Sequence, residues 1–172
     1  MHQLRISKTR VGCLIGKRGE TKKVIERSTS VRLKIDSEGD VEIVGDGYGE
    51  YICEKIVRAV GRGFNPDIAL NLIRDNWELE VIDIKDSVGK HKRRLAQVKA
   101  RLIGSQGKSR RIIERLTCCH VSIYGKTISL IGQLDNLHVA FKGITKLLQG
   151  SPHGNVYAFL EREMKKLRNR GQ

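Results

Sequence analysis

A stretch of 22 residues occurs twice in this chain, and this repeat is the strongest constraint on its fold. Residues 14–35 and 102–123 superimpose at an offset of 88 with nine identities, where average residue usage gives about one or two by chance. The identical pairs are Leu14 and Leu102, Ile15 and Ile103, Gly16 and Gly104, Gly19 and Gly107, Ile25 and Ile113, Glu26 and Glu114, Arg27 and Arg115, Thr29 and Thr117, and Ile35 and Ile123. We therefore expect the 172 residues to form two small units of one kind.

Each copy carries two glycines three positions apart at the end of an apolar segment. Residues 14–19 read Leu-Ile-Gly-Lys-Arg-Gly and residues 102–107 read Leu-Ile-Gly-Ser-Gln-Gly. The bare pattern decides nothing, because 18 glycines in 172 residues give about two such matches by chance. Its recurrence at the same place, before a basic run that ends in Ile-Glu-Arg, indicates a turn between two helices. Residues 16–19 are named the first glycine loop here, and residues 104–107 the second glycine loop.

Hydrophobic periodicity predicts the same order of elements in both units. Alternating apolar residues indicate strands, and apolar residues three or four apart indicate helices. In the first unit we expect strands at 2–6, 31–35 and 41–44 and helices at 9–15, 20–28 and 51–60. In the second we expect strands at 79–84, 120–124 and 127–131, a polar loop at 86–93, and helices at 95–102, 108–117 and 136–148. The predicted fold class is α+β, with the order β-α-α-β-β-α in each unit.

The helix after each glycine loop is amphipathic. Its apolar side, expected to face the core, carries Val24 and Ile25 in the first unit and Ile112, Ile113 and Leu116 in the second. Its other side is basic. Basic helix faces are usually only solvated, so a single lysine or arginine on that side does not indicate a ligand.

Composition shifts suggest four segments. We assign residues 1–63 to the first unit, 64–76 to a connecting helical segment, 77–150 to the second unit, and 151–172 to a C-terminal helix and a basic tail that frays. In the connecting segment, Asn65 is a plausible helix cap and Pro66 suits the first helical position. The apolar residues of 68–73 are expected to pack between the units, which leaves little hinge freedom.

The charge of the chain points to a polyanionic partner. There are 33 lysines and arginines against 19 aspartates and glutamates, a net charge of +14. Residues 91–132 hold ten of the basic residues and a single acid, Glu114, so the strongest positive field surrounds the second glycine loop. No lipidation motif, signal peptide or run of about 18 apolar residues is present, so a membrane partner is not supported. We expect a soluble, cytoplasmic protein.

A turn between two helices can hold a nucleic-acid backbone. Two residues without a Cβ beside a helix N-terminus let a phosphodiester approach backbone N–H groups and the positive end of the helix dipole. The candidate binding residues are Ile15, Gly16, Lys17, Arg18, Gly19 and Lys22 in the first unit and Arg101, Ile103, Gly104, Ser105, Gln106, Gly107, Lys108, Arg110 and Arg111 in the second. Because Ser105 and Gln106 are neutral, the second loop must rely on the cations around it. Ile15 and Ile103 are expected to form the floor of a groove for bases.

These features resemble the KH (hnRNP K homology) domain of type I. That family has the order β-α-α-β-β-α and an Ile-Gly-x-x-Gly loop followed by a helix with an isoleucine, and the loop clamps four nucleotides. Residues 14–25 and 102–113 both match this signature. The resemblance implies that the ligand is single-stranded RNA. The charge distribution then makes the second unit the main reader.

Nearly the whole chain is similar to a family of archaeal two-KH proteins related to the eukaryotic partner of the small-subunit rRNA dimethylase. The similarity lies in residues 61–66, 69–70, 101–114, 124–127, 151–153 and 157–161. It implies a ribosome-assembly factor that binds near the 3′ end of precursor 16S rRNA, with a PIN-domain endonuclease and small-subunit proteins as partners. We expect a monomer that acts as a placeholder and positions the rRNA end for processing by another protein.

The sequence offers no catalytic constellation. It has no Ser/His/Asp or Cys/His arrangement within a known motif, no Walker loop, and no acidic cluster in its basic half that could hold Mg²⁺. The cysteines Cys13, Cys53, Cys118 and Cys119 have neither zinc-site nor disulfide spacing, so we expect each to be buried and inert. We expect no enzyme activity, metal or cofactor. Glu26 and Glu114, which correspond in the two copies, are each expected to form a structural ion pair within their own unit.

Three other interpretations remain open. A Gly-x-x-Gly turn can be a plain connection between helices. The two units could instead form a protein-interaction scaffold in pre-ribosomes that binds RNA weakly and without specificity. An undetected nuclease is the third, and incubation of the pure protein with precursor rRNA and Mg²⁺ or Mn²⁺ would reveal it.

Overall fold

The computed structural model describes residues 1–89 and 91–171, and the chain divides into two compact units, Met1–Trp77 and Glu78–Gln172. Segment 64–76 lies in the first unit and the C-terminal helix in the second. Both units combine helices with a three-stranded sheet, so the predicted α+β class is confirmed.

The first unit contains the predicted strands and helices in the predicted order. Its elements are β1 (His2–Arg5), α1 (Lys8–Ile15), the 3-10 helix η1 (Lys17–Gly19), α2 (Glu20–Thr29), β2 (Arg32–Ile35), β3 (Asp40–Val44), α3 (Gly47–Gly61), α4 (Pro66–Ala69) and the 3-10 helix η2 (Leu70–Ile73). Asn65 caps α4 by accepting the Asp67 N–H, and Pro66 occupies its first turn, as expected. α4 and η2 pack against α3.

The second unit repeats this order and adds two helices. Its elements are β4 (Trp77–Asp83), α5 (Ile84–Val88), α6 (Lys92–Ile103), the 3-10 helix η3 (Ser105–Gly107), α7 (Lys108–Thr117), β5 (His120–Tyr124), β6 (Thr127–Gln133), α8 (Leu134–Leu148) and α9 (His153–Arg170). The additions are α5, before the first helix of the repeat, and α9, after the last.

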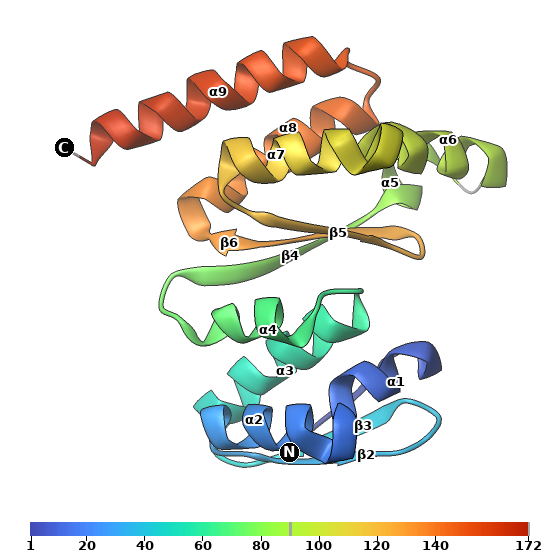
Figure 1. Cartoon of the computed structure of the whole chain (residues 1–172), viewed down its shortest axis with the longest axis vertical. Helices are drawn as coiled ribbons and strands as arrows, with labels where there is room; N and C mark the ends of the chain where they lie inside the picture. Colours follow the sequence, from blue (N-terminus) through green and yellow to red (C-terminus); the bar gives the residue numbers. More distant parts are fainter. Residues whose placement is uncertain (90, 172) are drawn as a thin grey trace. The chain divides into compact units, whose positions relative to one another are not determined.

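The first sheet is antiparallel, as is the β5–β6 pair of the second, and helices cover one face of each sheet. The strand orders are β1-β3-β2 and β4-β6-β5, and within each unit the helices on either side of the glycine loop lie over the sheet (Figure 1). In the second unit Tyr124 pairs with Thr127, so Gly125 and Lys126 form a two-residue turn with Gly125 at φ 56°. This is the predicted hairpin.

The repeated apolar residues form the two cores. In the first unit Leu14, Ile25, Leu33, Ile43 and Ile56 are fully buried. In the second, the buried side chains from the corresponding elements include Leu102, Ile113, Val121, Leu130 and Ile144. The helices that flank each glycine loop are thus anchored by leucine and isoleucine at both ends of the turn.

The prediction of a polar loop at 86–93 is wrong for residues 86–88 and 92–93, which are helical, and residue 90 lies outside the described residues. Residues 84–88 form α5, with Asp83 capping it by accepting the Lys85 N–H at 2.9 Å and Gly89 ending it at φ 74°. The helix α6 already begins at Lys92. Ile84 and Val88 are buried in the core of the second unit, so burial of two apolar residues stabilises a helix that is too short to form alone.

Several burial predictions also need correction. Val24 is 43% exposed and Ile112 is only half-buried, because the side of α2 or α7 that faces the core is narrower than the row of apolar residues in the sequence. Leu116 is half-buried and packs against the core of the second unit, as expected. Cys13 and Cys118 are exposed, whereas Cys53 and Cys119 are buried as expected. The basic C-terminal segment is helical to Arg170.

Candidate nucleic-acid interface

The two glycine loops have the same backbone conformation. The φ and ψ angles are 73° and 176° at Gly16 and 72° and 175° at Gly104. The third residues, Arg18 and Gln106, lie at 54°, 25° and 52°, 31°. In each loop the fourth residue donates its N–H to the carbonyl of the first at 3.2 Å. The repeat in sequence is therefore a repeat in geometry.

The first glycine of each loop is required by the fold. Its φ and ψ lie in a region that essentially only glycine adopts. A Cβ at Gly104 would be 2.7 Å from the Ser109 nitrogen and 2.9 Å from the Ser109 Cβ, and a Cβ at Gly16 would collide with the Thr21 side chain. These glycines let the chain fold back onto the first turn of the next helix.

The second glycine of each loop lies at an open surface, where a side chain would have room. A Cβ at Gly19 or Gly107 would meet no atom within 4 Å, although φ values of 76° and 75° still favour glycine. Each of these glycines precedes a helix and so offers no side chain to cap it. The glycine leaves the first backbone N–H groups of α2 and α7 without a neighbouring side chain to cover them, and free N–H groups at a helix N-terminus bind anions.

The middle residues of both loops point away from the core. Lys17, Arg18, Ser105 and Gln106 are all exposed. Any charge placed at these positions will therefore act on a ligand at the loop and leave the protein interior unaffected.

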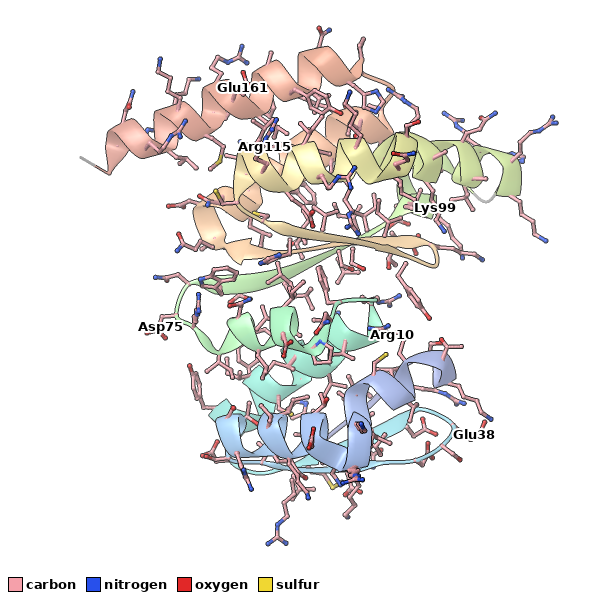
Figure 2. The ribbon with its side chains drawn as sticks, in the orientation of Figure 1. Arg10, Glu38, Asp75, Lys99, Arg115 and Glu161 are labelled. Carbon is pink, nitrogen blue, oxygen red and sulfur yellow. The ribbon has the colours of Figure 1, made fainter. Side chains whose placement is uncertain are left out.

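The cations around the two loops differ in how exposed they are. Lys108, Arg110 and Arg111 are exposed on the first turns of α7, and Arg115, labelled in Figure 2, continues that face. Lys22 is half-buried, with its Nζ 4.0 Å from Glu26. The second loop is neutral itself but is followed by a helix whose exposed side is largely arginine, as the sequence predicts.

The predicted groove floor is partly open. Ile15 is half-buried and Ile103 is 37% exposed, each directly before its loop. In the first unit a pocket of about 600 Å³ lies between the end of α2 and the start of β2, lined by Glu26, Arg27, Ser30, Val31, Arg32 and Val44. That pocket does not include Ile15. Both isoleucines remain predicted base contacts.

Arg101 is engaged within the protein. Its guanidinium donates to the carbonyl oxygens of Ser151 at 2.7 Å and Leu147 at 3.5 Å, at the end of α8. In the first unit Arg10, labelled in Figure 2, donates to the carbonyls of Val60 and Phe64 at 2.8 Å, at the end of α3. An arginine near a helix C-terminus satisfies unpaired carbonyls and the negative end of the dipole. Arg101 therefore has a structural role that competes with the predicted RNA contact.

The acid shared by the two copies of the repeat holds a strand. Glu26 Oε1 accepts the Leu33 N–H at 2.8 Å, and Glu114 Oε1 accepts the Val121 N–H at 2.9 Å. The expected ion pairs are present but long, at 4.0 Å to Lys22 and 3.9 Å to Arg110. The backbone bond is thus the closer contact, and it fixes the strand that borders the candidate binding surface.

Two residues near the second loop were not identified from the sequence. Tyr157 and His153 of α9 bond to Ser109 and to the Arg101 carbonyl. Both lie in stretches, 151–153 and 157–161, that resemble the archaeal two-KH family, but nothing in the sequence indicates which residues they contact. Among the described residues, no three His, Cys, Asp or Glu side chains are grouped to hold a metal ion, and no helix is long and apolar enough to cross a membrane.

Two family models match the chain, one on each unit. Residues 1–59 match the KH domain, and residues 78–165 match the eukaryotic type KH domain, KH-domain type I. Both matches span a glycine loop. Neither model describes an enzyme.

Several archaeal proteins and structures are similar to nearly the whole chain. A KH domain-containing protein of Methanocaldococcus jannaschii is 45% identical over 170 residues, covering 96% of this chain and 74% of the relative. The crystal structure of Dim2p from Pyrococcus horikoshii is 40% identical with a TM-score of 0.88, covering 94% of this chain and 98% of that one. A structure of an a/eIF2alpha-aDim2p-rRNA complex from the same organism is also 40% identical, with a TM-score of 0.89 and 96% and 94% covered.

Proposed function

The chain belongs to the KH-domain family, as a tandem KH protein of the Dim2p type, and we propose that it grips single-stranded rRNA with its two glycine loops. It is an RNA-binding protein of ribosome biogenesis. The observation that carries the proposal is a pair of loops with nearly equal dihedral angles, each with exposed middle residues and followed by a helix whose first turn has no side-chain cap.

In the proposed complex, phosphates contact the loops and bases lie against the neighbouring helix and strand. The N–H groups at the starts of α2 and α7, with the helix dipole, hold phosphate oxygens. Lys17, Arg18 and Lys22 add charge at the first loop, and Lys108, Arg110 and Arg111 do so at the second. Ile15 and Ile103 contact bases. Phosphate contacts then provide most of the affinity, and base edges provide a modest sequence preference.

We propose that the second unit is the main reader. Its loop is followed by three exposed cations within four residues, and residues 91–132 carry ten basic residues against one acid. The first unit, with 13 basic and 9 acidic residues in 1–63, has a weaker field. Long-range attraction of RNA therefore favours the second loop.

The proposed target is the 3′ end of precursor 16S rRNA. A related structure contains a/eIF2alpha, aDim2p and rRNA, which supports an rRNA ligand for this chain as well. We propose that the protein binds as a monomer, keeps the rRNA end single-stranded, and positions it for a PIN-domain endonuclease among small-subunit proteins. It contributes binding energy and geometry while the endonuclease does the chemistry.

The test of RNA binding exploits the exposed middle residues. The double variant Ser105→Asp/Gln106→Asp places two negative charges at the phosphate site, and αL geometry at position 106 tolerates aspartate. The matched control is Ser105→Asn/Gln106→Asn, which has nearly the same shape without charge. We expect the aspartate pair to weaken single-stranded RNA binding about tenfold or more, and the asparagine pair to change it little. Equal affinities would remove the second loop from the binding site.

The same substitutions at Lys17 and Arg18 measure the first loop. For a single-stranded RNA, the logarithm of the binding constant falls with the logarithm of the salt concentration, with a slope of about −0.7 for each phosphate contacted. The change in this slope in each variant shows how many phosphate contacts the variant has lost. The loops are compared at an equal charge change of two units, so Ser105→Asp/Gln106→Asp is set against Lys17→Asn/Arg18→Asn, and we expect the second-loop pair to weaken RNA binding more. A wild-type protein that binds duplex RNA as well as single strands would favour the protein-interaction scaffold instead.

The rRNA target is tested by crosslinking the protein in its native extract and sequencing the attached RNA. We expect reads to concentrate at the 3′ end of 16S rRNA and its precursor. Reads spread evenly over ribosomal RNA would contradict that target. In a reconstituted cleavage reaction, the aspartate variant should lower the rate or accuracy of trimming by the endonuclease.

A further inference from the structure

The C-terminal helix α9 lies along the helices that support the second glycine loop. It packs against α7 and α8, which Figure 1 shows within the second unit. Val156, Leu160 and Met164 are buried in this contact, and a Cβ at Gly143 of α8 would be 2.6 Å from the Leu160 Cδ2. The match of residues 78–165 to a single KH model includes most of α9. The helix is thus an integral part of this unit.

One side chain of α9 reaches the start of α7. Tyr157 Oη donates to Ser109 Oγ at 3.1 Å, and Ser109 is 3% exposed. Ser109 also packs directly against the loop, since its nitrogen and Cβ occupy the space that a side chain at position 104 would need. Tyr157 therefore holds the residue that determines where the loop begins its turn.

A second side chain of α9 reaches the end of α6. His153 Nε2 lies 2.8 Å from the carbonyl oxygen of Arg101, three residues before Gly104. A carbonyl only accepts, so Nε2 carries the proton. The chain leaves the helical path at Gly104, and the carbonyls of the last turn lack partners within the helix. His153 supplies one of those partners from outside.

Arg101 connects the hydrogen bond from His153 to the end of α8. Its guanidinium donates to Leu147 and Ser151, at the end of α8, while its carbonyl accepts from His153 at the start of α9. The ends of α6 and α8 and the start of α9 are therefore tied through one residue. Together with Tyr157 and Ser109, contacts from α9 reach the chain on both sides of the second glycine loop.

The first glycine loop has a different support. Cys13 and Thr21 occupy the positions of Arg101 and Ser109, and Thr21 packs directly behind Gly16. After α3 the chain continues into the four-residue α4, where the second unit has the 18-residue α9. The two loops share dihedral angles but differ in what holds them.

We propose that His153 and Tyr157 are positioning residues that brace the second glycine loop in its RNA-binding conformation. This inference rests on the proposed RNA binding by that loop. Binding to a loop that is already ordered costs less conformational entropy, so the brace raises the affinity of the second unit without touching RNA. It gives the second loop an advantage that its neutral middle residues do not provide.

The test uses Tyr157→Phe, which removes one hydroxyl, and Tyr48→Phe on an exposed tyrosine of the first unit as the matched control. His153→Leu removes the second bond, and His153→Gln, which keeps an N–H donor, should partly restore it. Amide hydrogen exchange is measured at residues 105–109, with residues 17–21 as an internal reference. The RNA dissociation constant is measured on the same full-length proteins.

We expect faster exchange at 105–109 in Tyr157→Phe and His153→Leu, unchanged exchange at 17–21 and in β6 and α8, and RNA binding weaker by about 2- to 10-fold for each bond removed. A general loss of stability would instead raise exchange throughout the second unit, and that result would overturn the brace. So would unchanged exchange at 105–109. Faster exchange in a protein whose wild type does not bind RNA would contradict the proposed function and leave the brace standing.

Discussion

Glu114 is bonded to the backbone of Val121, seven residues further along the chain. The Glu114 Oε1 accepts the Val121 N–H at 2.9 Å, and Glu26 accepts the Leu33 N–H at 2.8 Å in the other unit. Both strands are at the edge of their sheets, where an outward N–H has no strand to pair with. The glutamate side chain fills that vacancy from the preceding helix.

Removing this acceptor should destabilise the second unit. Glu114→Ala leaves a half-buried N–H unsatisfied, and we expect a loss of about 1–3 kcal/mol in the free energy of unfolding. Glu114→Gln keeps a side-chain oxygen and should lose less. Urea unfolding followed by circular dichroism measures both, with Glu161→Ala on the exposed side of α9, labelled in Figure 2, as control. A Glu114→Ala protein as stable as the wild type would contradict this account.

Alanine at the two glycines of one loop should have unequal effects. Gly104→Ala forces a side chain into a glycine-only conformation and against the backbone of Ser109, so we expect a loss of about 3 kcal/mol or more. In Gly107→Ala the new methyl group meets open space, so we expect only the loss that a left-handed backbone conformation causes for alanine, about 1–2 kcal/mol. Thermal unfolding of the two variants gives the comparison. Equal losses would mean that the backbone relaxes around position 104.

Substituting Arg101 should affect stability more than RNA binding. Arg101→Gln removes a guanidinium that satisfies carbonyls at the end of α8, and we expect a loss of about 1–2 kcal/mol. Because that charge is directed into the protein, the salt dependence of RNA binding should keep its slope. Arg111→Gln, on the exposed face of α7, is the contrasting variant and should reduce the slope. If Arg101→Gln reduced the slope of the salt dependence, Arg101 would contact RNA after all.

The buried thiols predict loss of stability at high pH. Burial raises the pKa of Cys53 from 9.0 to about 12 and that of Cys119 from 9.0 to about 11. Between pH 9 and 11 the unfolded chain releases both protons while the folded chain keeps them, so the free energy of unfolding falls as pH rises. The slope is up to about 1.4 kcal/mol per pH unit for each thiol.

The measurement compares wild type with Cys53→Ala and Cys119→Ala between pH 8 and 11. Each alanine variant starts less stable because of the cavity, but its stability should fall less steeply with pH. In the folded protein at pH 8, a thiol reagent should modify Cys13 and Cys118, which are exposed, and spare the other two. Rapid modification of all four would show that the cores open readily.

The repeat predicted the fold well because its signals are local. Alternating apolar residues set the hairpin strands, Gly125 and Lys126 set the tight turn, and the glycine pairs set the turn between helices. Each depends on neighbours within a few positions. The loop geometry, the order of elements and the basic exposed face of α7 were all within reach of the sequence.

Features that depend on distant partners were not predicted. The five residues of α5 are too few for a periodic pattern, so the sequence predicts a loop there, although Asp83 and Gly89 are residues that cap helices. Residue type predicts a buried Cys13 and the apolar side of the helix predicts a buried Val24, but both are exposed, because exposure depends on which way a short helix faces. The bonds of Arg101, His153 and Tyr157 join residues about 50 positions apart.

The tight packing behind Gly16 and Gly104 changes how such motifs should be interpreted across genomes. A descendant copy that had lost its ligand would still need glycine there to fold, so selection would retain the motif after its purpose had gone. The two residues between the glycines face no such constraint. Their drift towards aspartate or glutamate would mark a silenced copy.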